Sequence, residues 1–196
     1  MFDIEKLQQS FKDYSKDFKK NRKNAMGMLK ELYPIPSNLT DDEKKFFLIW
    51  GIDSFPLLSY LRCNDGHFDE YFEKFHYNLN KGISKYDNIK VNSILFRRVF
   101  NDFFIVNEGE VGIFNTPLST TFDSNSNLDF GNHLIKILAP IGTNGAYIEE
   151  LMLNGNYSQH LNEWILPKGT IYKTLYKDYS RKLAIIIIMG DVYNAI

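Results

Sequence analysis

The chain has 196 residues, of which 44% are hydrophobic, 15% aromatic and 24% charged. This length and composition suit a folded protein with a sizeable core, in one large domain or one domain with an added lobe, and exclude a disordered chain. The formal net charge of −1 gives no reason to expect nucleic acid as a partner.

The first part of the sequence has helical periodicity. Between residues 3 and 33, apolar side chains recur every three or four positions, which predicts one or two helices, and Pro34 and Pro36 end the pattern. We expect residues 1–36 to form a helical extension and residues 37–196 to form the main part of a single compact domain.

Further helical segments follow the two prolines. Thr40 precedes three acidic residues in an arrangement typical of a capping box, and a second helix runs through Leu57, Leu58 and Leu61. Residues 68–85 carry aromatic and aliphatic side chains on one side of another predicted helix. Up to this point the sequence is typical of a helical protein.

After residue 88 the periodicity changes to short runs of β-forming residues separated by turns. Helices first and strands second predict an α+β fold with segregated layers. The expected strands cover residues 93–100, 118–122, 134–138, 164–166, 170–172 and 183–189.

Residue types exclude several kinds of site. The only cysteine, Cys63, cannot form an intrachain disulfide or a cysteine-based zinc site, and the four histidines lack the spacing of metal ligands, so we expect no metal. The charged amino terminus shows no secretory signal, and the longest apolar run, residues 183–189, is too short to cross a bilayer. We therefore expect a soluble protein without a membrane partner that acts in a cytosol, including that of a target or host cell.

Three polar features stand out in chain order: Arg97 in a predicted strand, Ser119-Thr120-Thr121 at a strand start, and Glu163 before the run 164–166. Each is ordinary when taken alone, because charged residues at strand edges are usually solvated and Ser and Thr are common in strands. A carboxylate at the mouth of a hairpin is, however, well placed to meet a ligand.

Together and in this order, these features resemble the Arg, Ser-Thr-Ser, Glu signature of the mono-ADP-ribosyltransferase family, in its bacterial toxin branch. The resemblance covers roughly residues 39–190 and implies helices followed by a core of two packed, mainly antiparallel β-sheets. Besides the signature, the similar segments are residues 39–62, 79–85, 96–98, 117–122, 140–147 and 163–170.

The resemblance implies NAD as substrate and a role for each residue. Glu163 would stabilise positive charge on the ribose as the nicotinamide bond breaks, and Arg97 would meet the anionic part of NAD with its guanidinium fork. Ser119 would orient Glu163. The remaining expected NAD contacts are Thr120, Thr121, the backbone of Arg98 and Lys136. Thr121 would support the strand geometry, the backbone of Arg98 would read the nicotinamide amide, and Lys136 would be a second phosphate-contacting base or simply a solvated lysine.

The sequence departs from the family pattern at Leu161, two residues before Glu163. Family members usually carry Glu or Gln there, which helps to select the acceptor, and leucine can neither donate nor accept a hydrogen bond. Gln159, His160 or Asn162 could substitute, or the protein could mainly hydrolyse NAD or be a catalytically inactive interaction module. We expect a macromolecular acceptor, of protein nature, contacted by the loop 149–162, in which Met152, Leu153 and Tyr157 either meet the partner or pack on the domain.

Overall fold

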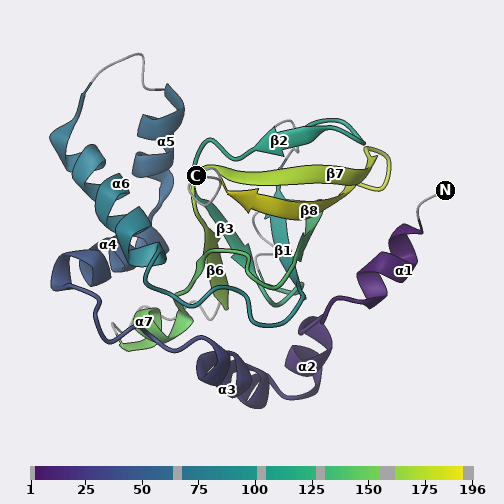
Figure 1. Ribbon diagram of the computed structural model, residues 1–196, viewed down its shortest axis with the longest axis horizontal. Coiled ribbons are helices and arrows are strands. Elements are labelled where there is room, and N and C mark those ends of the chain that lie inside the picture. Colours follow the sequence, from purple (N-terminus) through teal and green to yellow (C-terminus); the bar gives the residue numbers. More distant parts are fainter. Residues whose placement is uncertain (1–2, 64–67, 101–104, 127–130, 155–161, 192–196) are drawn as a thin grey trace.

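Helices and strands are segregated in the tertiary structure, as the sequence predicts. The computed structural model describes residues 3–63, 68–100, 105–126, 131–154 and 162–191. Within these ranges, helices α1 to α6 precede the first strand, and an eight-stranded sheet follows with one short helix between its strands. Figure 1 shows the helices along one side and the lower edge of the sheet. The expected α+β class is confirmed.

The N-terminal segment forms three short helices, whereas one or two were expected. These are α1 (Ile4–Gln9), α2 (Ser15–Lys20) and α3 (Arg22–Leu32). The break between α2 and α3 is at Asn21, whose φ of −158° is extended and whose side chain accepts a hydrogen bond from Asn24 N–H as an N-cap. The division at residue 36 stays a prediction. Helices α2 and α3 contribute buried side chains to the core of the sheet.

A second helical group covers one end of the sheet. It comprises α4 (Asp41–Ile52), α5 (Phe55–Cys63) and α6 (Glu70–Ile83). The predicted capping box is confirmed: Thr40 Oγ1 accepts from Glu43 N–H at 3.2 Å, and Glu43 Oε2 accepts from Thr40 N–H at 2.8 Å. Helix α4 buries Phe46, Phe47 and Trp50, so its apolar face lies against α6 and the sheet.

All eight strands belong to one hydrogen-bonded sheet in the order β2-β7-β8-β4-β1-β3-β6-β5. Neighbouring strands are antiparallel except β4 and β8, which are parallel. The strands are β1 (Ser93–Val99), β2 (Val111–Ile113), β3 (Leu118–Thr121), β4 (His133–Ala139), β5 (Ala146–Tyr147), β6 (Glu163–Leu166), β7 (Thr170–Asp178) and β8 (Leu183–Asp191).

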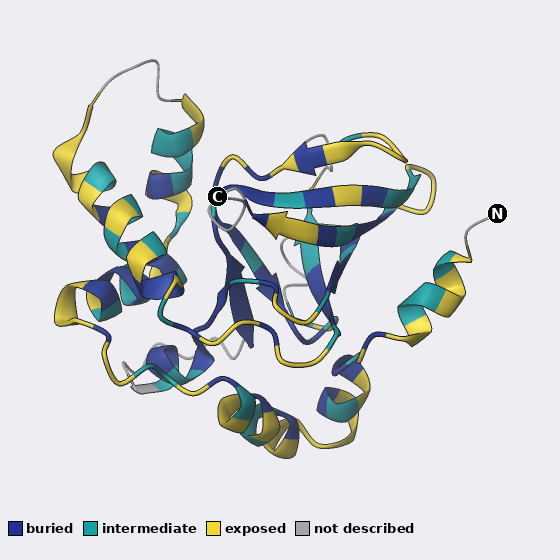
Figure 2. Ribbon diagram, in the orientation of Figure 1, coloured by how far each residue is buried: buried dark blue, intermediate teal, exposed yellow. Residues whose placement is uncertain are grey.

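The sheet bends so that its two halves share one core. Strands β2, β7 and β8 run across the direction of β1, β3 and β6 in Figure 1. Leu95 and Trp164 from one half lie in the same buried cluster as Tyr172 and Ile186 from the other. The described strands therefore form one hydrogen-bonded sheet, where two packed sheets were expected from the sequence. Strand β6 is buried along its whole length, which Figure 2 shows in dark blue.

Helix α7 (Glu149–Asn154) occupies the start of the segment that was expected to be a loop. Met152 is 7% exposed and packs in the cluster of α4 and α6, so of the two expected alternatives the structure shows packing on the domain. The close approach depends on Gly51, because a side chain there would overlap the Met152 sulfur. Tyr157 lies outside the described residues.

Candidate active site

Strand β6 carries Glu163 into the interior of the protein. The residue is 6% exposed and lies directly opposite Thr121 of β3, while Ser119 lies opposite Ile165. Directly opposite residues share a face of a sheet, so both Ser119 and Thr121 lie on the Glu163 side of β3. The Ser119 hydroxyl acts on the Glu163 carboxylate and lowers its pKa. The fold therefore brings these two residues together on neighbouring strands.

Helix α4 supplies a second hydrogen bond to Glu163. The indole Nε1 of Trp50 donates to Glu163 Oε1 at 3.0 Å, across 113 residues of sequence. Trp50 is not among the site residues predicted from the sequence. A signal was available, because a tryptophan on the apolar face of a helix needs an acceptor for its N–H once it is buried.

The pKa of Glu163 is raised above the ordinary range of a glutamate, chiefly by its burial. The hydrogen bonds from Ser119 and Trp50 and the positive charge of Arg97 lower this pKa, and the negative charge of Glu149 raises it further. The carboxylate is therefore held where its charge is poorly solvated. An ionised carboxylate in such an environment interacts strongly with a positive charge that develops beside it.

Arg97 connects two strands that otherwise diverge. Among the described residues, the register of β1 and β3 holds a single pair, Phe96 with Thr121. Beyond that pair, Arg97 Nη1 donates to the Ser119 carbonyl oxygen at 2.5 Å. Burial lowers the pKa of Arg97 to about 10, with Glu163 acting against this change and Arg62 adding to it. Arg97 thus remains cationic at neutral pH, and the exposed Arg62 of α5 brings a second positive charge near the site.

Known proteins are similar to this chain in fold. No family model and no curated protein matches the chain. Solved structures do match: the ADP-ribosyltransferase toxin Plx2a from Paenibacillus larvae has a TM-score of 0.64 and 17% identity, with 78% of this chain and 88% of the toxin covered. This chain has the fold of the bacterial ADP-ribosyltransferase toxins. The resemblance predicted from the sequence is confirmed at the level of the fold.

Two other structures with the toxin fold give the same result. The C3 exoenzyme of Clostridium limosum has a TM-score of 0.62 and 18% identity over 78% of this chain and 87% of the exoenzyme. C3stau2 from S. aureus, solved with NAD, has a TM-score of 0.59 and 19% identity over 79% of this chain and 89% of its own.

The other two residues of the predicted Ser-Thr-Thr motif serve the strand itself in this toxin-like fold. Thr120 Oγ1 donates to the Trp164 carbonyl oxygen at 2.6 Å, and Thr121 Oγ1 accepts from Asp123 N–H at 3.0 Å. Both hydroxyls therefore fix β3 and the turn after it. These side-chain bonds to backbone atoms hold the strand in which Ser119 lies.

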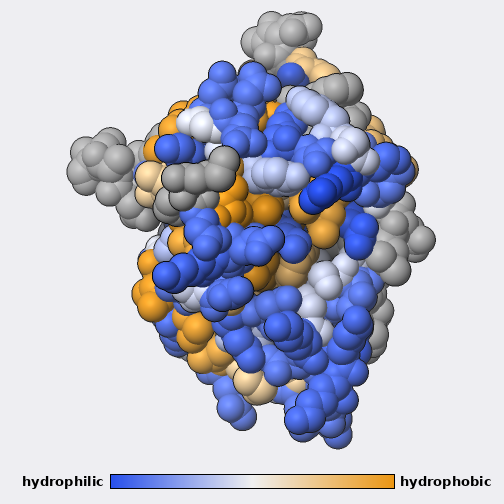
Figure 3. All heavy atoms as spheres, turned by 90° about the vertical axis from the view of Figure 1, so that its right-hand side faces the viewer, coloured by the Kyte–Doolittle hydropathy of each residue, from blue (hydrophilic) through white to orange (hydrophobic). Residues whose placement is uncertain are grey.

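The register aligns Lys136 of β4 with Phe96, Thr121 and Glu163 in one row, with one residue on each of four neighbouring strands. The row crosses four strands through Thr121 and Phe96, so Lys136 shares a face with Glu163 at a distance of roughly 14 Å by strand spacing. Lys136 lines a groove of about 1080 Å³ that α1 borders. Figure 3 looks onto this side of the molecule and shows apolar side chains at the bottom of a hollow with a hydrophilic rim. Arg98 lies opposite Leu134, on the same face as Phe96.

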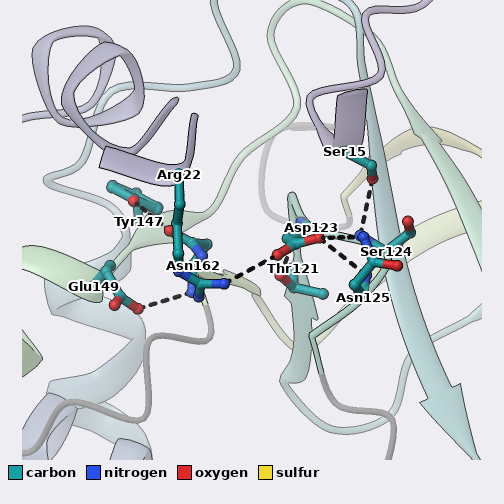
Figure 4. A network of polar contacts seen from close by, with 9 residues as sticks. All are labelled: Ser15, Arg22, Thr121, Asp123, Ser124, Asn125, Tyr147, Glu149 and Asn162. Atoms are coloured by element: carbon teal, nitrogen blue, oxygen red, sulfur yellow. Dashed lines mark hydrogen bonds and ion pairs between the residues drawn. The ribbon is translucent and has the colours of Figure 1, made fainter. Parts of the chain in front are cut away.

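Asn162 directs the chain into β6. It has the left-handed φ of 51° and is fully buried, and its backbone N–H donates to Glu149 Oε2 at 2.8 Å (Figure 4). Tyr147 Oη donates to Asn162 Oδ1 at 3.4 Å, and the Asn162 carbonyl accepts from Phe122 N–H at 3.3 Å. The amide thus faces the interior, which corrects the suggestion that Asn162 substitutes for Leu161 in contacting an acceptor.

The N-terminal segment contacts the turn that follows β3, the strand that carries Ser119. Arg22 Nη1 lies 3.4 Å from Asp123 Oδ2, and the Ser15 hydroxyl accepts from Ser124 N–H at 2.9 Å (Figure 4). Both contacts meet the turn that follows β3. The extension is therefore packed against the candidate site.

Among the described residues, no group of three His, Cys, Asp or Glu side chains is placed to hold a metal ion. No helix in those residues is long and apolar enough to span a membrane.

Proposed function

We propose that the chain is an NAD-dependent mono-ADP-ribosyltransferase of the toxin or effector type. It transfers ADP-ribose from NAD to a macromolecular acceptor and releases nicotinamide. The observation that carries the proposal is the buried Glu163, held by the Ser119 hydroxyl next to the cationic Arg97, within the fold of the bacterial ADP-ribosyltransferase toxins. The structure of C3stau2 with NAD supports NAD as the substrate.

The geometry suits a reaction whose transition state carries positive charge on a sugar. As the bond between ribose and nicotinamide breaks, the Glu163 carboxylate accepts a ribose hydroxyl hydrogen bond and stabilises the developing cation. Because burial has already removed water from Glu163, this stabilisation needs little reorganisation. Ser119 and Arg97 keep the carboxylate and β3 in place.

The remaining NAD contacts follow the same proposal. Arg97 meets the diphosphate, the backbone of Arg98 reads the nicotinamide amide, and Lys136 contacts the anionic part of NAD from the far end of the row. Thr120 and Thr121 act through the strand. The acceptor is a protein in a cytosol and is contacted by the segment 149–162, with its buried Met152 excluded.

A second candidate function is hydrolysis of NAD to ADP-ribose and nicotinamide on the same site. One observation favours it: Leu161 stands where the related enzymes usually carry a Glu or Gln that helps to select the acceptor. Water then takes the place of the acceptor. A catalytically inactive interaction module is the third candidate.

Incubation of the purified protein with labelled NAD, with and without cell lysate, separates these candidates. Label on a lysate protein supports transfer, nicotinamide release without protein label supports hydrolysis, and no turnover with no NAD binding by calorimetry excludes both enzymes. Glu163→Gln abolishes turnover by the proposed mechanism. Glu31→Gln, which neutralises an exposed carboxylate on α3, is the matched control and keeps full turnover.

A further inference from the structure

The contact between Trp50 and Glu163 joins the helical part of the molecule to the candidate catalytic strand. Trp50 is 2% exposed on α4, and Glu163 is 6% exposed at the start of β6. Their hydrogen bond is 3.0 Å long and buried. An indole N–H is a donor only and carries no charge, so its partner must be an acceptor. The carboxylate oxygen is that acceptor.

Packing fixes the direction of this donor. The indole ring lies in the buried cluster that contains Phe46 and Phe47 of α4 and Ile165 of β6. Ile165 is two residues from Glu163 on the same face of β6, so the ring packs on the face of the strand that carries the carboxylate. Because the ring is enclosed, the N–H has one orientation, and Glu163 Oε1 is set by α4 as well as by its own strand.

We propose that Trp50 is a positioning residue of the candidate active site, whose indole N–H holds the Glu163 carboxylate in one orientation. The inference rests on the proposed function and deepens it. Trp50 acts only through Glu163. Its hydrogen bond stabilises the ionised carboxylate and restricts its rotation, so the carboxylate faces the ribose with less reorganisation.

Besides Trp50, three charged or polar groups from other elements face Glu163 and act on its pKa. They are Ser119 from β3, Arg97 from β1 and Glu149 at the start of α7. Loss of the Trp50 N–H removes one of the contributions that lower the pKa of Glu163. The acid limb of the pH–rate profile then moves to higher pH in a Trp50 variant.

The chain offers a matched control for a tryptophan substitution. Its only other tryptophan, Trp164, is fully buried next to Glu163 in sequence, and its Nε1 has no hydrogen-bond acceptor among the described residues. Trp50→Phe and Trp164→Phe therefore make the same change in a buried site. Only the first removes a hydrogen bond to Glu163.

Steady-state kinetics with NAD test the catalytic effect. We expect Trp50→Phe to lower kcat by about 10- to 100-fold, the usual range for a hydrogen bond to a charged group. KM for NAD changes less than about twofold, since the substitution leaves in place the contacts that bound NAD and the transition state share. The acid limb moves to higher pH in Trp50→Phe and stays at its wild-type position in Trp164→Phe. An unchanged kcat and acid limb in a folded Trp50→Phe protein would overturn the proposal.

Proton–nitrogen NMR of the indole groups tests the bond without any turnover. The Trp164→Phe spectrum retains the Trp50 signal alone, which thus becomes assigned. We expect this signal to shift with pH along the Glu163 titration and to lose that shift in Glu163→Gln. A signal that does not titrate overturns the proposal, even if Trp50→Phe fails to fold. Titration in a protein that shows no turnover supports the positioning contact and rejects the proposed function alone.

Discussion

Glu149 accepts a hydrogen bond from the backbone N–H of Asn162, with 2.8 Å between Oε2 and the nitrogen, at the residue immediately before Glu163. The same carboxylate raises the pKa of Glu163 by its charge. It therefore has two separable effects on the candidate catalytic residue. One is mechanical and depends on an acceptor oxygen; the other is electrostatic and depends on charge.

Substitutions at Glu149 separate the two effects. Glu149→Gln keeps an acceptor for Asn162 and removes the charge, so the pKa of Glu163 falls and the acid limb of kcat/KM moves to lower pH. Glu149→Ala leaves a buried N–H without its acceptor and lowers the free energy of unfolding by about 1–3 kcal/mol. A pH–rate profile and urea unfolding measure the two results. Equal stability of both variants would show that the hydrogen bond to Asn162 contributes nothing.

The left-handed backbone of Asn162 gives a second prediction. With φ at 51°, glycine is accepted there, whereas valine is strained by about 1–2 kcal/mol or more. We expect Asn162→Val to melt well below Asn162→Gly in thermal denaturation followed by circular dichroism, although both lose the Tyr147 contact. The opposite order would mean that β6 is entered by another backbone path.

Arg97 gives a third prediction because it bridges β1 and β3. Lysine keeps the charge but lacks the planar fork that reaches the Ser119 carbonyl and a phosphate together. Arg97→Lys lowers kcat/KM for NAD by about 10- to 100-fold. Arg181→Lys, a change on an exposed surface arginine that pairs with Asp178, is the control and leaves kcat/KM unaltered. A wild-type kcat/KM in Arg97→Lys would exclude a bidentate role.

Lys136 tests the extent of the substrate site along the row from Glu163. If its ammonium meets the anionic part of NAD, Lys136→Ala raises KM for NAD by about three- to tenfold and leaves kcat unchanged. Lys23 of α3 is exposed and lies outside the residues that line this groove, so Lys23→Ala is the matched control. KM values measured at two salt concentrations complete the test, since a phosphate contact weakens with salt. Equal KM values in wild type and Lys136→Ala would confine NAD to the Glu163 end.

Glu163 also affects stability as a function of pH. Its pKa is higher in the folded protein than in the unfolded chain, where it is about 4.3, so the folded state holds the proton more tightly. Stability contributed by this group is present below pH 4.3 and is lost as pH rises through the folded pKa. Glutamine does not titrate. We expect Glu163→Gln to gain stability relative to wild type across this window, by at most about 1.4 kcal/mol per pH unit, in guanidinium unfolding. A difference that does not change with pH would contradict the raised pKa.

The local sequence determined which elements form. The capping box at Thr40 and the runs of β-formers at residues 93–100 and 183–189 rely on short-range hydrogen bonds and side-chain shape, and each led to an element close to its predicted place. The order of Arg97, Ser119 and Glu163 likewise determined the family resemblance. These features are readable because helix capping and strand propensity act within a few residues.

Tertiary packing alone decided how the elements serve the site. Burial of Glu163, its hydrogen bond from Trp50 and the left-handed Asn162 depend on contacts between segments far apart in the sequence, such as the 113 residues that separate Trp50 from Glu163. Helix α7 formed where a loop was expected, because Met152 finds a buried place beside Gly51 of α4. Desolvation and hydrogen-bond geometry arise only after the chain has folded, so they converted an ordinary strand-edge glutamate into a buried carboxylate with a raised pKa.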